Sequence, residues 1–203
     1  SAGRRVVVVD GRVLVPTHGA MRAFAAADGD SDWTTALPDE GGDRVGGPGG
    51  THRQIDTTPR VASGRCFVAS LSSVYALGTG AGRPRLRIDV ASSVDGLTLL
   101  GNTLFVASRL GDGEFLTAFD TATGVERWRV PDRPVPVAAD ADRLLVARRG
   151  SPGEPDADRG RLDARDPADG ALLWESEARG PAVAGEPTGI ALAGDAVYTA
   201  REG

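Results

Sequence analysis

The sequence predicts an all-β fold, and two observations carry this prediction. Helical periodicity is nearly absent, whereas short runs rich in β-branched residues, such as "CFVAS", "TLFVAS" and "AVYTA", are separated by Gly and Asp-Gly turns. The turns that precede five such runs recur at intervals of 38 to 53 residues. They begin at Asp10, Ser63, Gly101, Ala141 and Gly194. A repeat of about 40 to 50 residues with four short strands is typical of the blades of a β-propeller.

The composition excludes some classes of partner. The 203 residues carry a formal net charge of −5, and 40% of them are hydrophobic, so the chain can bury a sizeable core. Its 23 basic residues, all arginines, form no basic stripe, which argues against nucleic acid as a partner. No apolar stretch reaches the length of a transmembrane helix, and "SAGRR" at the start has no apolar signal core. Any signal segment or membrane tether is therefore expected to lie outside this chain or to be absent.

A second repeated pattern follows the strand runs. Its full form, A-x-D-x-x-T-G-x-x-x-W, is "AFDTATGVERW" at residues 118–128. "ARDPADGALLW" at 164–174 has Asp169 in place of the Thr, and "AFAAADGDSDW" at 23–33 lacks the first acid. "ALGTGAGRPRL" at 76–86 keeps only the Ala and the Gly, with Leu86 where the Trp is expected. The motif residues are Ala118, Asp120, Thr123, Gly124, Trp128, Ala164, Asp166, Gly170, Trp174, Ala23, Gly29 and Trp33.

Each position of this motif has a local physical reason. The alanine leaves room on its strand for a neighbouring aromatic ring, and the Asp and Thr can bond backbone amides across the turn. The glycine adopts the positive φ that the turn requires. The Trp then emerges on the next strand as a large apolar plate with one N–H to satisfy. The motif therefore predicts a packing device between repeats.

The motif resembles the tryptophan-docking motif of the quinoprotein-type β-propellers, the family of PQQ-like repeats. The resemblance extends over residues 4–201 and implies that the Trp of one blade packs against a small residue of the adjacent blade. It also implies that Trp128 and Trp174 are mostly buried at such contacts.

The resemblance divides the single domain at 1–203 into about four complete blades and a partial fifth. The predicted blades are 4–37, 58–90, 93–131, 134–177 and 187–203, with a Gly-rich loop at 38–57 and a polar insertion at 149–160. Propellers of this family resemble closed rings of six to eight blades, so we expect the chain to be part of a longer protein or to complete its ring with other sequence.

The family's dehydrogenases hold pyrroloquinoline quinone (PQQ) between a Trp and a vicinal disulfide, near Ca²⁺ and an Asp base. This chain has one cysteine, Cys66 in the apolar run "RCFVA", so that disulfide is excluded and Cys66 is expected to be a buried hydrophobe. No catalytic residue can be carried over, and we expect no cofactor. Asp28, Asp30 and Asp32 alternate like the start of a calcium loop, but the pattern half fails, because position six should be Gly and is Trp33, while position twelve is Asp39. They are weak metal candidates.

The resemblance implies a non-catalytic propeller that binds a protein partner or senses a ligand. Members of this kind include an outer-membrane-assembly lipoprotein and the extracytoplasmic sensor domains of receptor-type Ser/Thr kinases, all bacterial. The resemblance therefore implies an extracytoplasmic or cell-envelope location for this chain. The alternative is part of a PQQ-dependent dehydrogenase whose catalytic residues lie outside this chain.

Overall fold

The described part of the chain consists of strands and turns. The computed structural model describes residues 6–17, 19–37, 58–70, 72–90, 93–110, 113–131, 134–148, 161–176, 189–193 and 196–200. Over these ranges it has strands, turns and bends but no helix. Accordingly, no helix in them is long and apolar enough to cross a membrane.

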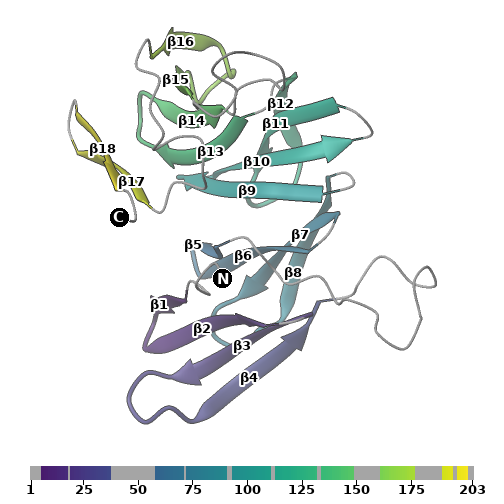
Figure 1. Ribbon diagram of the computed structural model, residues 1–203. Coiled ribbons are helices and arrows are strands. Elements are labelled where there is room, and N and C mark those ends of the chain that lie inside the picture. The colour runs from purple at the N-terminus through teal and green to yellow at the C-terminus, as the bar shows by residue number, and fades with distance from the viewer. Residues whose placement is uncertain are drawn as a thin grey trace, which may run out of the picture. The chain divides into compact units, whose positions relative to one another are not determined.

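Five antiparallel sheets follow one another along the chain, four with four strands and one with two (Figure 1). Within each four-stranded sheet the strands lie side by side in chain order, as in a meander. This architecture confirms the predicted all-β fold with four-stranded blades and a partial fifth. The predicted boundaries of the blades remain a prediction, and the loop at 38–57 and the insertion at 149–160 lie outside the described residues.

The chain divides into two compact units, the first of which comprises Ser1–Asp95 and Ala122–Gly124. Its first sheet contains β1 (Val7–Val9), β2 (Arg12–Thr17), β3 (Ala20–Ala25) and β4 (Ser31–Ala36). Its second sheet contains β5 (Arg60–Ala62), β6 (Arg65–Ser70), β7 (Ser73–Gly78) and β8 (Pro84–Asp89).

The second unit comprises Gly96–Thr121 and Val125–Gly203. The third sheet contains β9 (Ser93–Leu100), β10 (Thr103–Leu110), β11 (Gly113–Asp120) and β12 (Glu126–Pro131). The fourth contains β13 (Pro134–Ala139), β14 (Leu144–Arg148), β15 (Arg161–Arg165) and β16 (Leu172–Glu175), and the fifth contains β17 (Gly189–Ala193) and β18 (Ala196–Ala200).

The burial of each strand follows its sequence. The middle strands β6 and β10 are continuous apolar runs, and their central residues are buried on both faces. The outer strands β4 and β12 alternate instead, so that exposed polar side chains separate half-buried ones. The third sheet, which contains both β10 and β12, therefore has an apolar centre and a polar outer edge.

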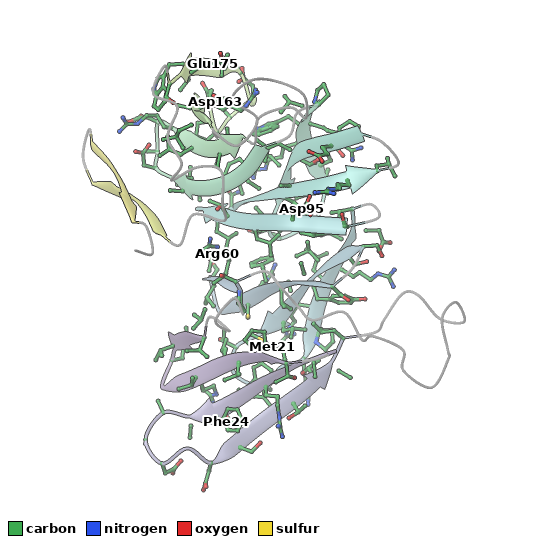
Figure 2. The ribbon with its side chains drawn as sticks, viewed as in Figure 1. Met21, Phe24, Arg60, Asp95, Asp163 and Glu175 are labelled. Atoms are coloured by element: carbon green, nitrogen blue, oxygen red, sulfur yellow. The ribbon has the colours of Figure 1, made fainter. Side chains whose placement is uncertain are left out.

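Each unit has its own hydrophobic core. The first is formed by buried side chains of the first two sheets, among them Met21, which is labelled in Figure 2. Its members are Leu14, Met21, Ala23, Leu37, Cys66, Val68, Tyr75 and Leu77, with Trp33 packed against them. The second unit has a comparable cluster from the third and fourth sheets, namely Phe105, Leu116, Ala118, Leu144 and Val146, with Trp128 packed against it. In both units the apolar side chains of successive sheets meet.

Candidate functional site

The motif forms a six-residue turn between the third and fourth strands of each four-stranded sheet. We call these the docking turns, and they are Ala25–Asp30, Gly78–Arg83, Asp120–Val125 and Asp166–Ala171. In all four, the amide of the first residue donates to the carbonyl of the last, over 2.8 to 2.9 Å. The fifth residue is a glycine with φ of 81°, 64°, 73° and 78°, respectively. A left-handed glycine at this point lets the chain turn back without strain.

Beside each docking turn, the first and last residues of the motif lie opposite one another on adjacent strands. Ala23 pairs with Trp33, Ala76 with Leu86, Ala118 with Trp128 and Ala164 with Trp174. Directly after each alanine the register shifts by a β-bulge. The residue before the aromatic position is thus the extra, bulged one, and we call Asp32, Arg85, Arg127 and Leu173 the bulge residues.

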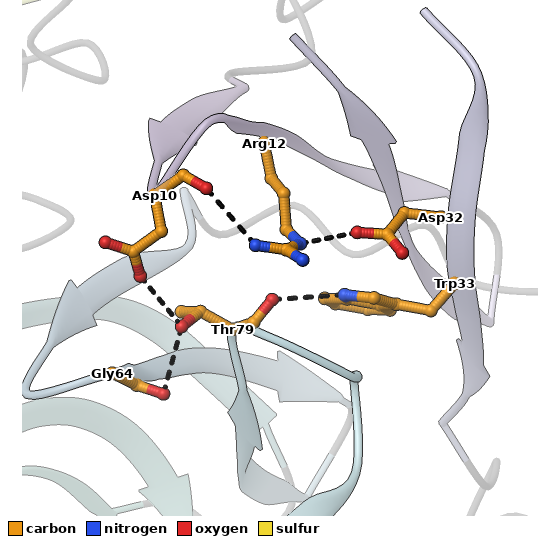
Figure 3. A network of polar contacts seen from close by, with 6 residues as sticks. All are labelled: Asp10, Arg12, Asp32, Trp33, Gly64 and Thr79. Atoms are coloured by element: carbon orange, nitrogen blue, oxygen red, sulfur yellow. Dashed lines mark hydrogen bonds and ion pairs between the residues drawn. The ribbon is translucent and has the colours of Figure 1, made fainter.

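Within the first unit, Trp33 of the first sheet lies against the docking turn of the second (Figure 3). Its Nε1 donates to the carbonyl oxygen of Thr79 over 3.1 Å. A Cβ atom on Gly82 would lie 2.4 Å from Cε3 of the indole, so only a glycine lets the ring approach this closely. The hydroxyl of Thr35 adds a 2.7 Å bond to the carbonyl of Gly82. The indole is therefore held by apolar contact and by its single polar atom.

Within the second unit, Trp128 makes the same contact with the docking turn of the fourth sheet. Its Nε1 donates to the carbonyl of Pro167 over 3.1 Å, and a Cβ on Gly170 would lie 2.8 Å from Cε3 of the ring. The ring also packs 5.7 Å, centroid to centroid, from Phe105. The resemblance implied that a small residue of the adjacent blade receives the Trp. In both contacts that residue is the glycine, whereas the motif's alanine lies across from the Trp within the same sheet.

Trp174 was expected to be mostly buried, and this prediction is wrong, because its side chain is 38% exposed. Leu172 and Leu173 on the same strand are also exposed. The glycine turn that receives Trp33 and Trp128 follows the third strand of the next sheet. The fifth sheet, which follows Trp174, has only two strands, β17 and β18, among the described residues. No third strand places such a turn against this indole there.

The motif acids have two different partners. Asp166 accepts the amide of Ala168 over 2.7 Å, and Asp169, at the Thr position, accepts the amide of Ala171 over 2.8 Å, as the motif predicts for these positions. Asp120 instead accepts a 2.7 Å bond from the guanidinium of Arg127. Thr123 lies in the same docking turn. Asp166 and Asp169 therefore stabilise their own turn, whereas Asp120 pairs with the bulge residue beside its turn.

The calcium candidates are engaged within the first sheet. Asp32 forms an ion pair with Arg12, and Asp28 accepts the amide of Asp30 over 3.0 Å (Figure 3 shows the ion pair). Across the described ranges, no three His, Cys, Asp or Glu side chains come together as a group that could hold a metal ion. Cys66 is fully buried, and desolvation raises the pKa of its thiol to about 12.

Sequence reasoning missed Thr79 and Thr35, which supply the polar half of the Trp33 contact. The hydroxyl of Thr79 also bonds to the carboxylate of Asp10 over 3.1 Å. The signal was present, because Thr79 immediately precedes the Gly-Ala-Gly of the weakest motif copy. It was overlooked because that copy has no Trp of its own.

Sheets of four antiparallel strands, joined within each unit by an indole lying on a glycine turn, define a β-propeller of PQQ-like repeats. A family model described as outer membrane protein assembly factor BamB matches residues 18–202, and the chain belongs to this family. No curated protein is significantly similar to the sequence.

Solved structures share the fold at low sequence identity. BamB from Moraxella catarrhalis superposes with a TM-score of 0.66 at 17% identity, over 97% of this chain and 57% of that one. The computationally designed Ika8 protein superposes with a TM-score of 0.68 at 13% identity, over 96% of this chain and 54% of that one. The quinohemoprotein alcohol dehydrogenase ADHIIG from Pseudomonas putida HK5 superposes with a TM-score of 0.64 at 14% identity, over 88% of this chain and 35% of that one. The chain thus spans about a third to somewhat over half of these structures, and the likeness concerns the fold alone.

Proposed function

We propose that this chain is a non-catalytic part of a PQQ-like propeller, which acts in the bacterial cell envelope as a scaffold that binds a protein partner or senses a ligand. The proposal rests on how two of the indole rings are held. Trp33 and Trp128 each pack against a glycine turn and donate their only N–H to a backbone carbonyl. A ring held in this way serves packing between neighbouring sheets.

The chemistry of Cys66 supports the same proposal. A quinone site of the kind seen in the family's dehydrogenases needs a disulfide opposite the stacking Trp. Cys66 is the one cysteine in the sequence, and its thiol is buried in the core of the first unit. The family description, which names an outer membrane protein assembly factor, favours a protein partner and an envelope location.

The scaffold role can be tested by site-specific photo-crosslinking in envelope extracts of the source organism. A photoreactive residue is placed at the exposed apolar positions Val8 and Val125, which are 67% and 63% exposed, and for comparison at the buried position Val106. We expect an adduct with one defined protein from an exposed position and none from Val106. The partner, once identified, must bind the purified chain in a reconstituted mixture. Failure of that reconstitution would contradict the scaffold role.

The alternative, part of a PQQ-dependent dehydrogenase, rests on the structural likeness to such an enzyme. It is tested separately by titrating PQQ with Ca²⁺ into the chain and following indole fluorescence and heat. We expect no saturable signal from the isolated chain. Stoichiometric quinone binding that is lost in Trp33→Phe would overturn the non-catalytic interpretation.

A further inference from the structure

The second sheet contains a pocket whose charged lining residues are all positive. It measures about 400 Å³ and is lined by nine residues from the β5–β6 turn, the start of β6, the docking turn Gly78–Arg83 and the start of β8. Three of them, Arg65, Arg83 and Arg85, are arginines, and none is an acid. This concentration of positive charge stands out in a chain whose net charge is −5. We call it the arginine pocket.

The first and third sheets show what occupies the equivalent place there. In the first sheet, the bulge residue Asp32 pairs with Arg12, the first residue of the second strand. In the third sheet, the bulge residue Arg127 donates to Asp120 over 2.7 Å and to Thr103, which begins the second strand, over 3.0 Å. In both, a carboxylate of the same sheet neutralises a guanidinium beside the docking turn.

In the second sheet, neither of the two positions that carry the acid in those sheets holds a carboxylate. The residue that begins the second strand is Arg65, and the bulge residue is Arg85. The position of Asp120 is taken by Gly78, which pairs with Arg65 across the strands. A Cβ on Gly78 would lie 3.5 Å from Nε of Arg85, so the guanidinium of Arg85 sits beside the place where the acid of the third sheet projects.

The groups around this place favour an anion. Among the described residues, neither Arg83 nor Arg85 forms an ion pair, and both side chains are exposed. The acid that touches the lining is Asp10, whose carboxylate accepts the hydroxyl of Thr79 over 3.1 Å. Its single charge opposes the guanidinium charges of Arg83 and Arg85, so the pocket retains an excess of positive charge.

We propose that the arginine pocket binds a carboxylate group, in the place that Asp120 fills in the third sheet. Arginine presents parallel N–H donors that match the two oxygens of a carboxylate, and such bonds are shorter and stronger than neutral ones. The volume is in the range of small-ligand pockets, which is about 300–1,000 Å³. The carboxylate comes either from a dissolved dicarboxylate or from an acidic side chain of a peptide. The inference does not depend on the scaffold role, because a protein partner can be found whether or not this pocket binds an anion.

Calorimetric titration of the 203-residue chain at low ionic strength tests the proposal, with glutarate, a blocked Asp-Glu-Asp peptide and inorganic phosphate as probes. We expect saturable binding of glutarate or of the peptide, and weaker binding of phosphate. Binding of glutarate alone identifies a dissolved ligand, and binding of the peptide alone identifies an acidic protein segment. No saturable heat from either carboxylate, or phosphate binding of equal affinity, would overturn the proposal.

Four variants localise the signal. Arg85→Gln should weaken binding at least tenfold, whereas Arg87→Gln, on the same strand but paired with Asp89 over 2.7 Å, should change it less than twofold. Gly78→Asp supplies the missing acid at a backbone that has no positive φ and should abolish binding while the chain stays folded by circular dichroism. Asp10→Asn removes the opposing charge and should tighten binding. Equal losses in the two arginine variants, or wild-type binding by folded Gly78→Asp, would contradict the site.

Discussion

Only glycine fits at position 170, because a Cβ atom there would lie 2.8 Å from Cε3 of Trp128. The same relationship joins Gly82 to Trp33 in the first unit. In each case the glycine serves two needs at once, a left-handed backbone and a flat surface for an indole. The two needs can be separated experimentally, because the chain also holds a glycine at the same motif position that receives no ring.

Gly82→Ala and Gly29→Ala form that matched pair. Both glycines have positive φ, 64° and 81°, but a Cβ on Gly29 would meet nothing within 4 Å, whereas one on Gly82 would overlap Trp33. Gly29→Ala should lower the free energy of unfolding by roughly 1–2 kcal/mol, the cost of a left-handed alanine. Gly82→Ala should cost at least ~2 kcal/mol more, since the ring must move away. Urea unfolding measures both, and equal losses would show that Trp33 is not held against the turn.

Trp128 and Trp174 occupy the same motif position but should differ in their contribution to stability. Trp128→Ala removes a ring packed on Gly170 and Phe105 and should cost about 3–5 kcal/mol. Trp174 is 38% exposed, so Trp174→Ala should cost less than about 1 kcal/mol. Thermal unfolding of the two variants checks this. A loss in Trp174→Ala as large as that in Trp128→Ala would show that its ring is docked after all.

The thiol of Cys66 should not react with thiol reagents while the chain is folded. Burial raises its pKa from 9.0 to about 12, so the folded state keeps the proton that the unfolded state releases. The resulting contribution to stability is complete below pH 9 and is lost as the pH rises from there toward 12. A thiol reagent at pH 8 should react at the rate of unfolding, and Cys66→Ala should flatten the fall in stability above pH 9. Rapid labelling of the native chain would contradict the buried position.

Much of the fold could be predicted because the repeat is local. Each motif lies within eleven residues, and its turn is closed by bonds between its own backbone atoms, as in Asp166–Ala171. The motif therefore revealed the sheets wherever the Trp or the glycine was retained. It could not reveal the exposure of Trp174, because that depends on what the next repeat places against the ring. The arginine pocket was missed for a related reason, since it arises from the absence of an acid at Gly78.

The carboxyl group of Asp89 provides a final prediction and also checks the control used for the arginine pocket. Bonds from Arg87 over 2.7 Å and from Ser73 over 3.0 Å hold its pKa below the usual 3.8. The stability that these bonds provide is present above the unfolded pKa and is lost as the pH falls through the lower folded value. It should be small, because the carboxylate is 73% exposed and is screened by solvent. Arg87→Gln should move the Asp89 titration, followed by carboxyl NMR shifts, back toward 3.8. An unchanged midpoint would mean that Arg87 is not paired with Asp89 in solution, and the variant would then not serve as a neutral control.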